Sequence, residues 1–138
     1  MGDRKQMNVE TFNLTTFSDD RGDLTVLENL KDVPFDFQRV FYVYGVKPEE
    51  RRGGHAHTMT SQFLICLNGK ITVECKDGEG TEFYILDSPK QGILIPSGIW
   101  AEQIYIEENS ILLVLCDHLY FEEDYIKSYE EFLQWKES

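Results

Sequence analysis

Basic residues are scarce in this sequence. Its 138 residues contain 13 lysines and arginines against 25 aspartates and glutamates, which gives a formal net charge of -12. A surface this acidic repels nucleic acid and anionic membranes, so we expect neither as a partner. Long apolar runs are also missing, since none approaches the roughly 20 residues that a membrane span needs. Residues 1–6 are polar and no hydrophobic segment follows them, so we expect no secretory signal and a cytoplasmic protein.

Cysteine and proline are rare as well. The three cysteines, Cys66, Cys75 and Cys116, lie in apolar or alternating segments. An odd count without a secretory signal is typical of reduced thiols, and we expect all three in the core. No proline-rich linker, low-complexity segment or repeat divides the chain, and 41% hydrophobic residues suffice for one core. We therefore expect a single domain over residues 1–138.

Short apolar segments separated by turn residues dominate the rest of the sequence. Ile71, Val73 and Cys75 alternate with polar neighbours, as in a half-buried strand, and the preceding Asn68-Gly69 suits a tight hairpin. Helical spacing occurs only over residues 122–135. This pattern predicts an all-β sandwich or jelly roll with a short C-terminal helix. The predicted strands are residues 9–17, 24–27, 37–46, 63–67, 70–76, 82–86, 92–96, 100–106 and 111–116.

Two of the three histidines are placed for joint chemistry. On a strand, His55 and His57 project from the same face. Two imidazoles that point into one cavity can bind a metal or exchange protons near neutral pH. His118 stands alone after the last predicted strand, where we expect a loop histidine.

The segment Gly54-His55-Ala56-His57, followed by Gln62, resembles the first signature motif of the cupin superfamily, and residues 96–101 resemble the second. In metal-binding cupins the position of Gln62 is a glutamate ligand and the position of Ala101 is a histidine ligand. The next carboxylate, Glu102, would point to the opposite face of its strand. With only two histidines left as ligands, we expect no metal site.

A narrower family matches nearly the whole chain in the same order. The matching segments are Asp20-Arg21-Gly22, Arg39-Val40-Phe41-Tyr42, residues 52–57, Cys66-Leu67-Asn68-Gly69, Leu86-Asp87-Ser88-Pro89 and Asp124-Tyr125-Ile126. With these segments the chain resembles the dTDP-sugar 3,4-ketoisomerases, which are metal-free cupins. The resemblance implies a jelly-roll homodimer, often with N-terminal strands exchanged, that needs no cofactor. It also implies a dTDP-4-keto-6-deoxyglucose substrate, whose 3-keto isomer an aminotransferase uses to make 3-amino-3,6-dideoxy sugars for surface polysaccharides.

The histidine pair suits this chemistry. Moving a ketone from C4 to C3 requires a base for the C3 proton and a donor for the developing oxyanion. His55 and His57 can divide these roles; the sequence cannot orient them, and we take His55 as the base. The resemblance adds Tyr42, whose hydroxyl can reach the sugar from the preceding strand.

Four further residues are candidates for holding the substrate. A guanidinium fork matches the oxygens of a pyrophosphate, which favours Arg52 and, in so acidic a protein, Arg21. Gln62 can hydrogen-bond a sugar hydroxyl, and Trp100 can line the cavity or stack on a ring. Solvated arginines, a structural glutamine and a core tryptophan are the ordinary alternatives.

Ala101 departs from the family pattern, because members carry a histidine or an arginine there. Arg21 resembles the subgroup with a galacto-configured product, yet that subgroup usually has histidine at the position of Ala101, so the product configuration stays open. Three other functions also stay open. They are an epimerase of the cupin group that acts at C3 and C5 of the same sugar, a non-catalytic sugar-binding module, and a metal-dependent dioxygenase-like cupin. The chain length and the spacing of the histidines favour the ketoisomerase.

Overall fold

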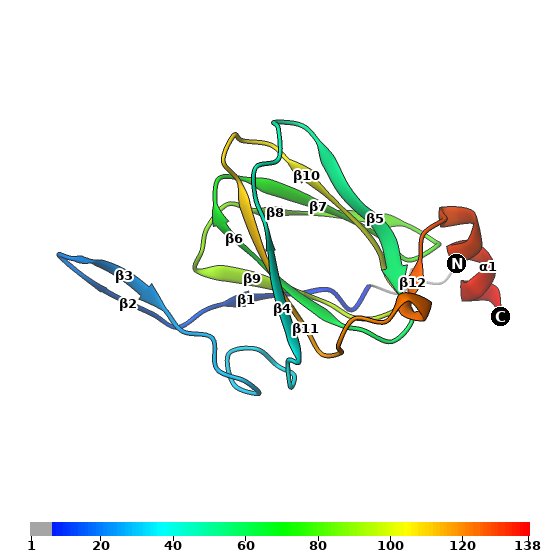
Figure 1. Ribbon diagram of the computed structural model, residues 1–138, viewed down its shortest axis with the longest axis horizontal. Coiled ribbons are helices and arrows are strands. Elements are labelled where there is room, and N and C mark those ends of the chain that lie inside the picture. Colours follow the sequence, from blue (N-terminus) through cyan, green and yellow to red (C-terminus); the bar gives the residue numbers. More distant parts are fainter. Residues whose placement is uncertain (1–6) are drawn as a thin grey trace, which may run out of the picture.

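The computed structural model of this protein describes residues 7–138. Two five-stranded antiparallel sheets face each other and enclose the core, which confirms the predicted all-β jelly roll (Figure 1). Within the described range no helix is both long and apolar enough to cross a membrane. The first sheet has the order β1 (Glu10–Asn13), β9 (Gln91–Ile95), β6 (Gln62–Asn68), β11 (Ile111–Cys116) and β4 (Arg39–Val43). The second has the order β12 (Tyr125–Ile126), β5 (Arg51–His57), β10 (Trp100–Tyr105), β7 (Ile71–Lys76) and β8 (Thr81–Leu86).

The core between the sheets follows from alternation along the strands. On β7, Ile71, Val73 and Cys75 are fully buried and the residues between them are half-buried. All three cysteines are buried and unpaired, as predicted. Burial raises the pKa of Cys66 to about 11 and that of Cys75 to about 12, so these two thiols stay protonated at neutral pH.

The Asn68-Gly69 turn connects the two sheets. Strand β6 pairs with β9 and β11, whereas β7 pairs with β8 and β10, so the predicted hairpin between them is wrong. Gly69 has a φ of 84°, and a Cβ atom there would overlap Ser110 Oγ. That hydroxyl accepts a hydrogen bond from the Lys70 amide at 3.1 Å. Gly69 therefore allows the chain to turn sharply from one sheet to the other.

The strand predicted over residues 9–17 is two strands. After β1 the chain leaves the sheet and forms β2 (Thr16–Asp19), which pairs with β3 (Gly22–Thr25). Leu14 anchors the chain at this point, because it is buried and its amide donates to the Lys90 carbonyl at 2.8 Å. The β2–β3 hairpin projects away from the two sheets (Figure 1). Its apolar residues Phe17 and Leu24 are exposed.

The helix predicted over residues 122–135 begins later than its periodicity indicates. A 3-10 turn, η1 (Glu122–Asp124), and strand β12 come first, and the helix α1 covers Tyr129–Glu137. Ser128 caps α1 with its side chain. Strand β12 pairs with β5, so a distant pairing overrides the local helical pattern.

Candidate active site

A β-bulge in β5 determines which side chains enter the space between the sheets. Along the neighbouring strand β10, Ala101 pairs with His55 but the next residue, Glu102, pairs with Gly53. The register therefore shifts by one residue at Gly54. An extra residue of this kind reverses the alternation of side chains along a strand.

Two consecutive glycines make the bulge possible. Gly53 and Gly54 have φ values of 87° and 71°, which other residues rarely adopt. A Cβ atom on Gly53 would also lie only 2.7 Å from Gln103 Oε1. The bulge lies between Arg52 and His55 and reverses the alternation of side chains. Arg52 and His55 therefore face the same side of β5.

Arg52, His55 and Gln62 line one cavity between the sheets. Arg52 is exposed, His55 is half-buried, and Gln62 is buried with its Nε2 donating to Cys116 Sγ at 3.5 Å. The structure thus brings three of the predicted site residues to one cavity, whose lining includes a cation and an imidazole. The other residues that line the cavity are Phe41, Val43, Gly53, Leu64, Gln103, Tyr105, Leu112 and Val114.

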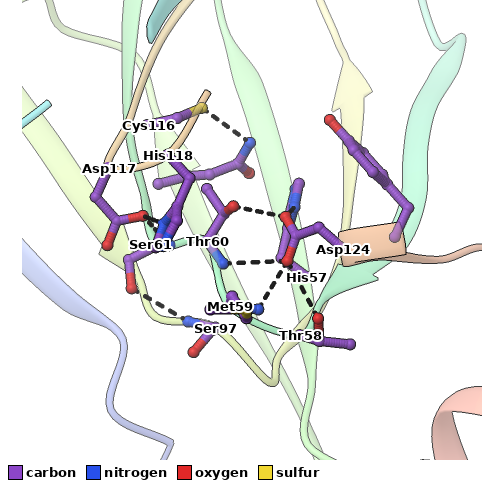
Figure 2. Close-up of polar contacts among 12 residues, drawn as sticks. His57, Thr58, Met59, Thr60, Ser61, Ser97, Cys116, Asp117, His118 and Asp124 are labelled. Carbon is purple, nitrogen blue, oxygen red and sulfur yellow. Dashed lines mark hydrogen bonds and ion pairs between the residues drawn. The ribbon is translucent and has the colours of Figure 1, made fainter. Parts of the chain in front are cut away.

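His57 lies against His55 and is more deeply buried. The two ring centroids are 5.0 Å apart, and the Tyr125 ring contacts both. His57 Nδ1 is 2.6 Å from Asp124 Oδ2 (Figure 2). The other ring nitrogen, Nε2, is buried and has no hydrogen-bond partner within residues 7–138. One nitrogen of His57 is therefore engaged, and the other is buried without a hydrogen-bond partner among the described residues.

Asp124 is buried and surrounded by donors. The Thr60 hydroxyl donates to its Oδ2 at 2.5 Å, and the Met59 amide donates to its Oδ1 at 2.7 Å (Figure 2). Burial opposes ionisation, but hydrogen bonds from Thr60, His57 and Met59 outweigh it and lower the pKa of Asp124 to about 2. Asp124 is therefore a carboxylate at neutral pH.

Sequence reasoning assigned no role to Asp124, because the helical pattern placed it in a helix. The signal that could have found it is the segment Asp124-Tyr125-Ile126, which belongs to the family resemblance. In the structure this segment ends η1 and forms β12 beside β5, which carries the histidines.

Both imidazoles of the pair are neutral at neutral pH. Burial, and then repulsion from His57, lowers the pKa of His55 to about 4. Burial also lowers the pKa of His57, although the hydrogen bond to Asp124 opposes this shift. A neutral imidazole carries a lone pair on one nitrogen and can accept a proton. The arrangement therefore suits the removal and return of protons on a molecule held in the cavity.

Tyr42 does not line this cavity. Phe41 and Val43 line the cavity, so Tyr42 between them points to the outer face of the first sheet. It is exposed there and stacks on Tyr44 with ring centroids 5.8 Å apart.

Arg21 and Trp100 also lie elsewhere. Arg21 is at the turn of the projecting β2–β3 hairpin, where its Nη2 donates to Asp19 Oδ2 at 3.2 Å (Figure 1). Trp100 is buried on the opposite face of β10 from Ala101, against the rings of Tyr129 and Phe132 in α1. It belongs to the core under the helix.

Residues 7–138 contain no group of three histidine, cysteine, aspartate or glutamate side chains that could hold a metal ion. Ala101 is buried in the main core opposite His55. His118, as predicted, lies after the last long strand, and its Nδ1 is 2.7 Å from Asp117 Oδ1 (Figure 2).

Comparisons with known proteins identify relatives over nearly the whole chain. The family model FdtA, described as WxcM-like, C-terminal, matches residues 7–137. The TDP-4-oxo-6-deoxy-alpha-D-glucose-3,4-oxoisomerase of Aneurinibacillus thermoaerophilus is 36% identical over 129 residues, which cover 94% of this chain and 93% of that protein. The crystal structure of a 3,4-ketoisomerase from Helicobacter canadensis matches with a TM-score of 0.93 and 36% identity over 96% of this chain and 100% of that one. A mutant of the 3,4-ketoisomerase QdtA from Thermoanaerobacterium thermosaccharolyticum, in complex with TDP-4-keto-6-deoxyglucose, has a TM-score of 0.93, with 32% identity and 96% of each chain covered.

Proposed function

The chain belongs to the FdtA family (WxcM-like, C-terminal), and on that premise we propose that it moves the keto group of dTDP-4-keto-6-deoxyglucose from C4 to C3. The observation that carries this proposal is the cavity that a neutral His55 lines together with Arg52 and Gln62. Two of the three relatives named above, by their names, act on or are solved with the same keto-deoxy sugar nucleotide. We take the whole chain, residues 1–138, as one cupin domain with this activity.

The two histidines divide the proton transfers. His55 lines the cavity and accepts the C3 proton, whose acidity the neighbouring carbonyl raises. His57 accepts the proton of the C3 hydroxyl and delivers it to the C4 oxygen, which gives an enediolate. The proton on His55 then returns to C4, so that C3 becomes the ketone and both imidazoles are neutral again. Protons and electrons balance within the sugar and the histidine pair, and no redox cofactor or metal enters the reaction.

Arg52 and Gln62 hold the substrate. Arg52 is exposed on the cavity, where its guanidinium can bind the pyrophosphate in two-pronged fashion. Gln62 offers its amide oxygen to a sugar hydroxyl, since its amide nitrogen already donates to Cys116. The nucleotide therefore lies toward the solvent and the reacting carbons lie toward His55.

Two copies of the chain form the working unit. An outer patch on the first sheet consists of the clustered residues Tyr42, Tyr44, Leu67, Ile111 and Leu113. The β2–β3 hairpin also projects with apolar side chains exposed. Clustered apolar surface of this kind is typical of an interface and supports a homodimer with exchanged N-terminal strands. In such a dimer the hairpin brings Arg21 to the second copy, where it is a further cation for the bound nucleotide. Tyr42 lies at the interface between the two copies.

The reaction has a place in a sequence of steps. The 3-keto product is the ketone that an aminotransferase needs to make a 3-amino-3,6-dideoxy sugar for surface polysaccharide. Three buried, unpaired cysteines support a reducing compartment, and we place the enzyme in the cytoplasm.

Incubation with dTDP-4-keto-6-deoxyglucose in deuterated water, followed by proton NMR, tests the function. We expect the C3 proton signal to disappear while a 3-keto sugar with deuterium at C4 accumulates, and the coupling at C4 will report a gluco or galacto product. Exchange at both C3 and C5 with the ketone still at C4 would indicate an epimerase instead. Binding without any exchange would indicate a non-catalytic module and would overturn the proposal.

A further inference from the structure

The donors around Asp124 fix the orientation of the ring beside it. Oδ1 accepts hydrogen bonds from the Met59 amide at 2.7 Å and from the Thr60 amide at 3.3 Å. Oδ2 accepts from the Thr60 hydroxyl at 2.5 Å and lies 2.6 Å from His57 Nδ1 (Figure 2). Because an ionised carboxylate can only accept, Nδ1 of His57 must carry the proton of this hydrogen bond.

We propose that Asp124 is a positioning residue that holds His57 as the Nδ1-protonated tautomer, so that Nε2 is the nitrogen that exchanges protons with the sugar. This inference rests on the proposed function and adds a residue to it. His57 is buried, and Nε2 is the ring nitrogen that no neighbour within residues 7–138 occupies. Its ring contacts His55, which lines the cavity.

The hydrogen bond between His57 Nδ1 and Asp124 also stabilises His57 when its ring carries an extra proton during turnover. A proton gained at Nε2 converts the ring into a cation, whose Nδ1 then donates to a carboxylate at 2.6 Å. A hydrogen bond between two charged partners is about twice as strong as a neutral one. Asp124 therefore affects both the tautomer of His57 and the free energy of its protonated form.

Asp124→Asn distinguishes this role from a purely structural one. The backbone amides of Met59 and Thr60 both donate to the position of Oδ1, so the single oxygen of an asparagine is held there. Its NH2 group then replaces Oδ2 and donates to Nδ1 of His57. The substitution should therefore invert the tautomer and place the proton on Nε2, where it blocks proton acceptance.

Nitrogen-15 NMR of protein labelled at histidine measures the tautomer directly, with His55→Asn and His118→Asn variants used to assign the His57 signals. We expect Nδ1 protonated and Nε2 unprotonated in the wild-type protein at neutral pH, and the reverse in Asp124→Asn. A wild-type His57 protonated at Nε2 would overturn the proposal, and this holds even if Asp124→Asn fails to fold. Nδ1 protonation in a chain that does not isomerise the sugar would overturn the proposed function and leave the tautomer assignment intact.

Kinetics provide the second readout. We expect Asp124→Asn to lower kcat by about 100-fold or more with little change in KM, because binding of the sugar nucleotide does not involve Asp124. Asp117→Asn is the matched control, since Asp117 makes the same kind of contact with His118 at 2.7 Å. It should leave kcat unchanged. A drop in melting temperature without a drop in the kcat of folded Asp124→Asn would show a structural role only and overturn the proposal.

Discussion

The buried His57–Asp124 pair and the outer face of the first sheet depart from ordinary burial in opposite directions. Inside, His57 and Asp124 are 5% and 1% exposed although both are polar. Outside, Tyr42 and Tyr44 are 63% and 68% exposed although both are large aromatic residues. Burying a charge is costly unless it is paired, and clustered apolar surface is unusual unless it is covered. The difference separates a region whose polar groups are paired from one whose aromatic side chains are exposed to solvent.

Replacing the interior base should have the largest effect. We expect His55→Asn to lower kcat by about 100- to 10,000-fold, because no other group in the cavity takes the C3 proton. Deuterium exchange at C3, followed by proton NMR, measures the rate. His118→Asn, which alters the histidine in the loop after β11, should retain the wild-type rate. A His55→Asn rate within tenfold of the wild type would contradict the assignment.

The pH dependence of kcat/KM tests whether burial lowers the pKa of His55. The pKa of His55 falls from 6.5 to about 4 on burial, so its neutral form persists as the pH drops through this range. We expect the acid limb of kcat/KM near pH 4 rather than 6.5. Over the same range the unfolded chain binds the proton first, so the free energy of unfolding should decrease as the pH falls from 6.5 toward 4. A limb near 6.5, at a pH where circular dichroism shows the protein folded, would contradict the burial argument.

The low pKa of Asp124 extends this loss of stability to lower pH. The pKa of Asp124 in the folded protein is about 2, below the ordinary value of 3.8. Its contribution to the free energy of unfolding is therefore complete above pH 4 and is lost as the pH falls toward 2. Urea denaturation at a series of pH values should show this second decrease in the wild-type protein. Asp124→Asn should lack it, whereas Asp117→Asn should keep it.

Straining the bulge tests how the interior is assembled. Gly53→Ala places a Cβ atom 3.1 Å from the Ala101 carbonyl oxygen and 2.7 Å from the movable Gln103 Oε1, at a φ of 87°. We expect it to lower the free energy of unfolding by about 2 kcal/mol. Gly45→Ala is the control, because Gly45 has a similar φ of 72° but no atom within 4 Å of the added Cβ. It should cost about 1 kcal/mol. Equal decreases in the free energy of unfolding for the two variants would show that the close approach to the Ala101 carbonyl does not matter.

A charge placed on the outer patch tests whether that patch is a dimer interface. We expect Tyr44→Asp to weaken dimerisation by about tenfold or more, as measured by sedimentation, because it buries a charge in an apolar interface. Phe83→Asp is the control, since Phe83 is 61% exposed on β8 of the other sheet. It should leave the dimer intact. A wild-type protein that sediments as a monomer would overturn the proposed interface.

Local pattern and motif spacing predicted the strands that bury a face and the residues that share the cavity. Arg52, His55 and Gln62 were all named from the sequence and line the same space. The sequence alone did not reveal which side of β5 Arg52 occupies, because a one-residue bulge at Gly54 decides it. Alternation along a strand is predictable, but an interruption of it depends on the neighbouring strand.

The parts that sequence reasoning missed all depend on distant pairings. Asp124 reaches His57 across 67 positions of the chain, and helical spacing around it gave no sign of this contact. Asn68-Gly69 has the composition of a hairpin, yet the strands on either side pair with other partners. Tyr42 matches a family motif, but its strand turns it outward. A motif identifies a residue and leaves open the face of the strand on which it lies.

The bulge in β5 also has a genetic consequence. Arg51, next to Arg52, faces outward and pairs with Glu74 and Glu102 at 3.5 and 3.3 Å. Deleting the Gly54 codon would remove the bulge yet leave Arg52 paired with Gln103, because Gly53 would still pair with Glu102. Straightening the bulge with both glycines kept would instead slide the preceding residues by one position and turn Arg51 inward in place of Arg52. The gene can therefore lose a codon here and keep Arg52 in the cavity. Changes in length at this glycine pair, as well as replacements, are a route by which descendants of this gene can reshape the site.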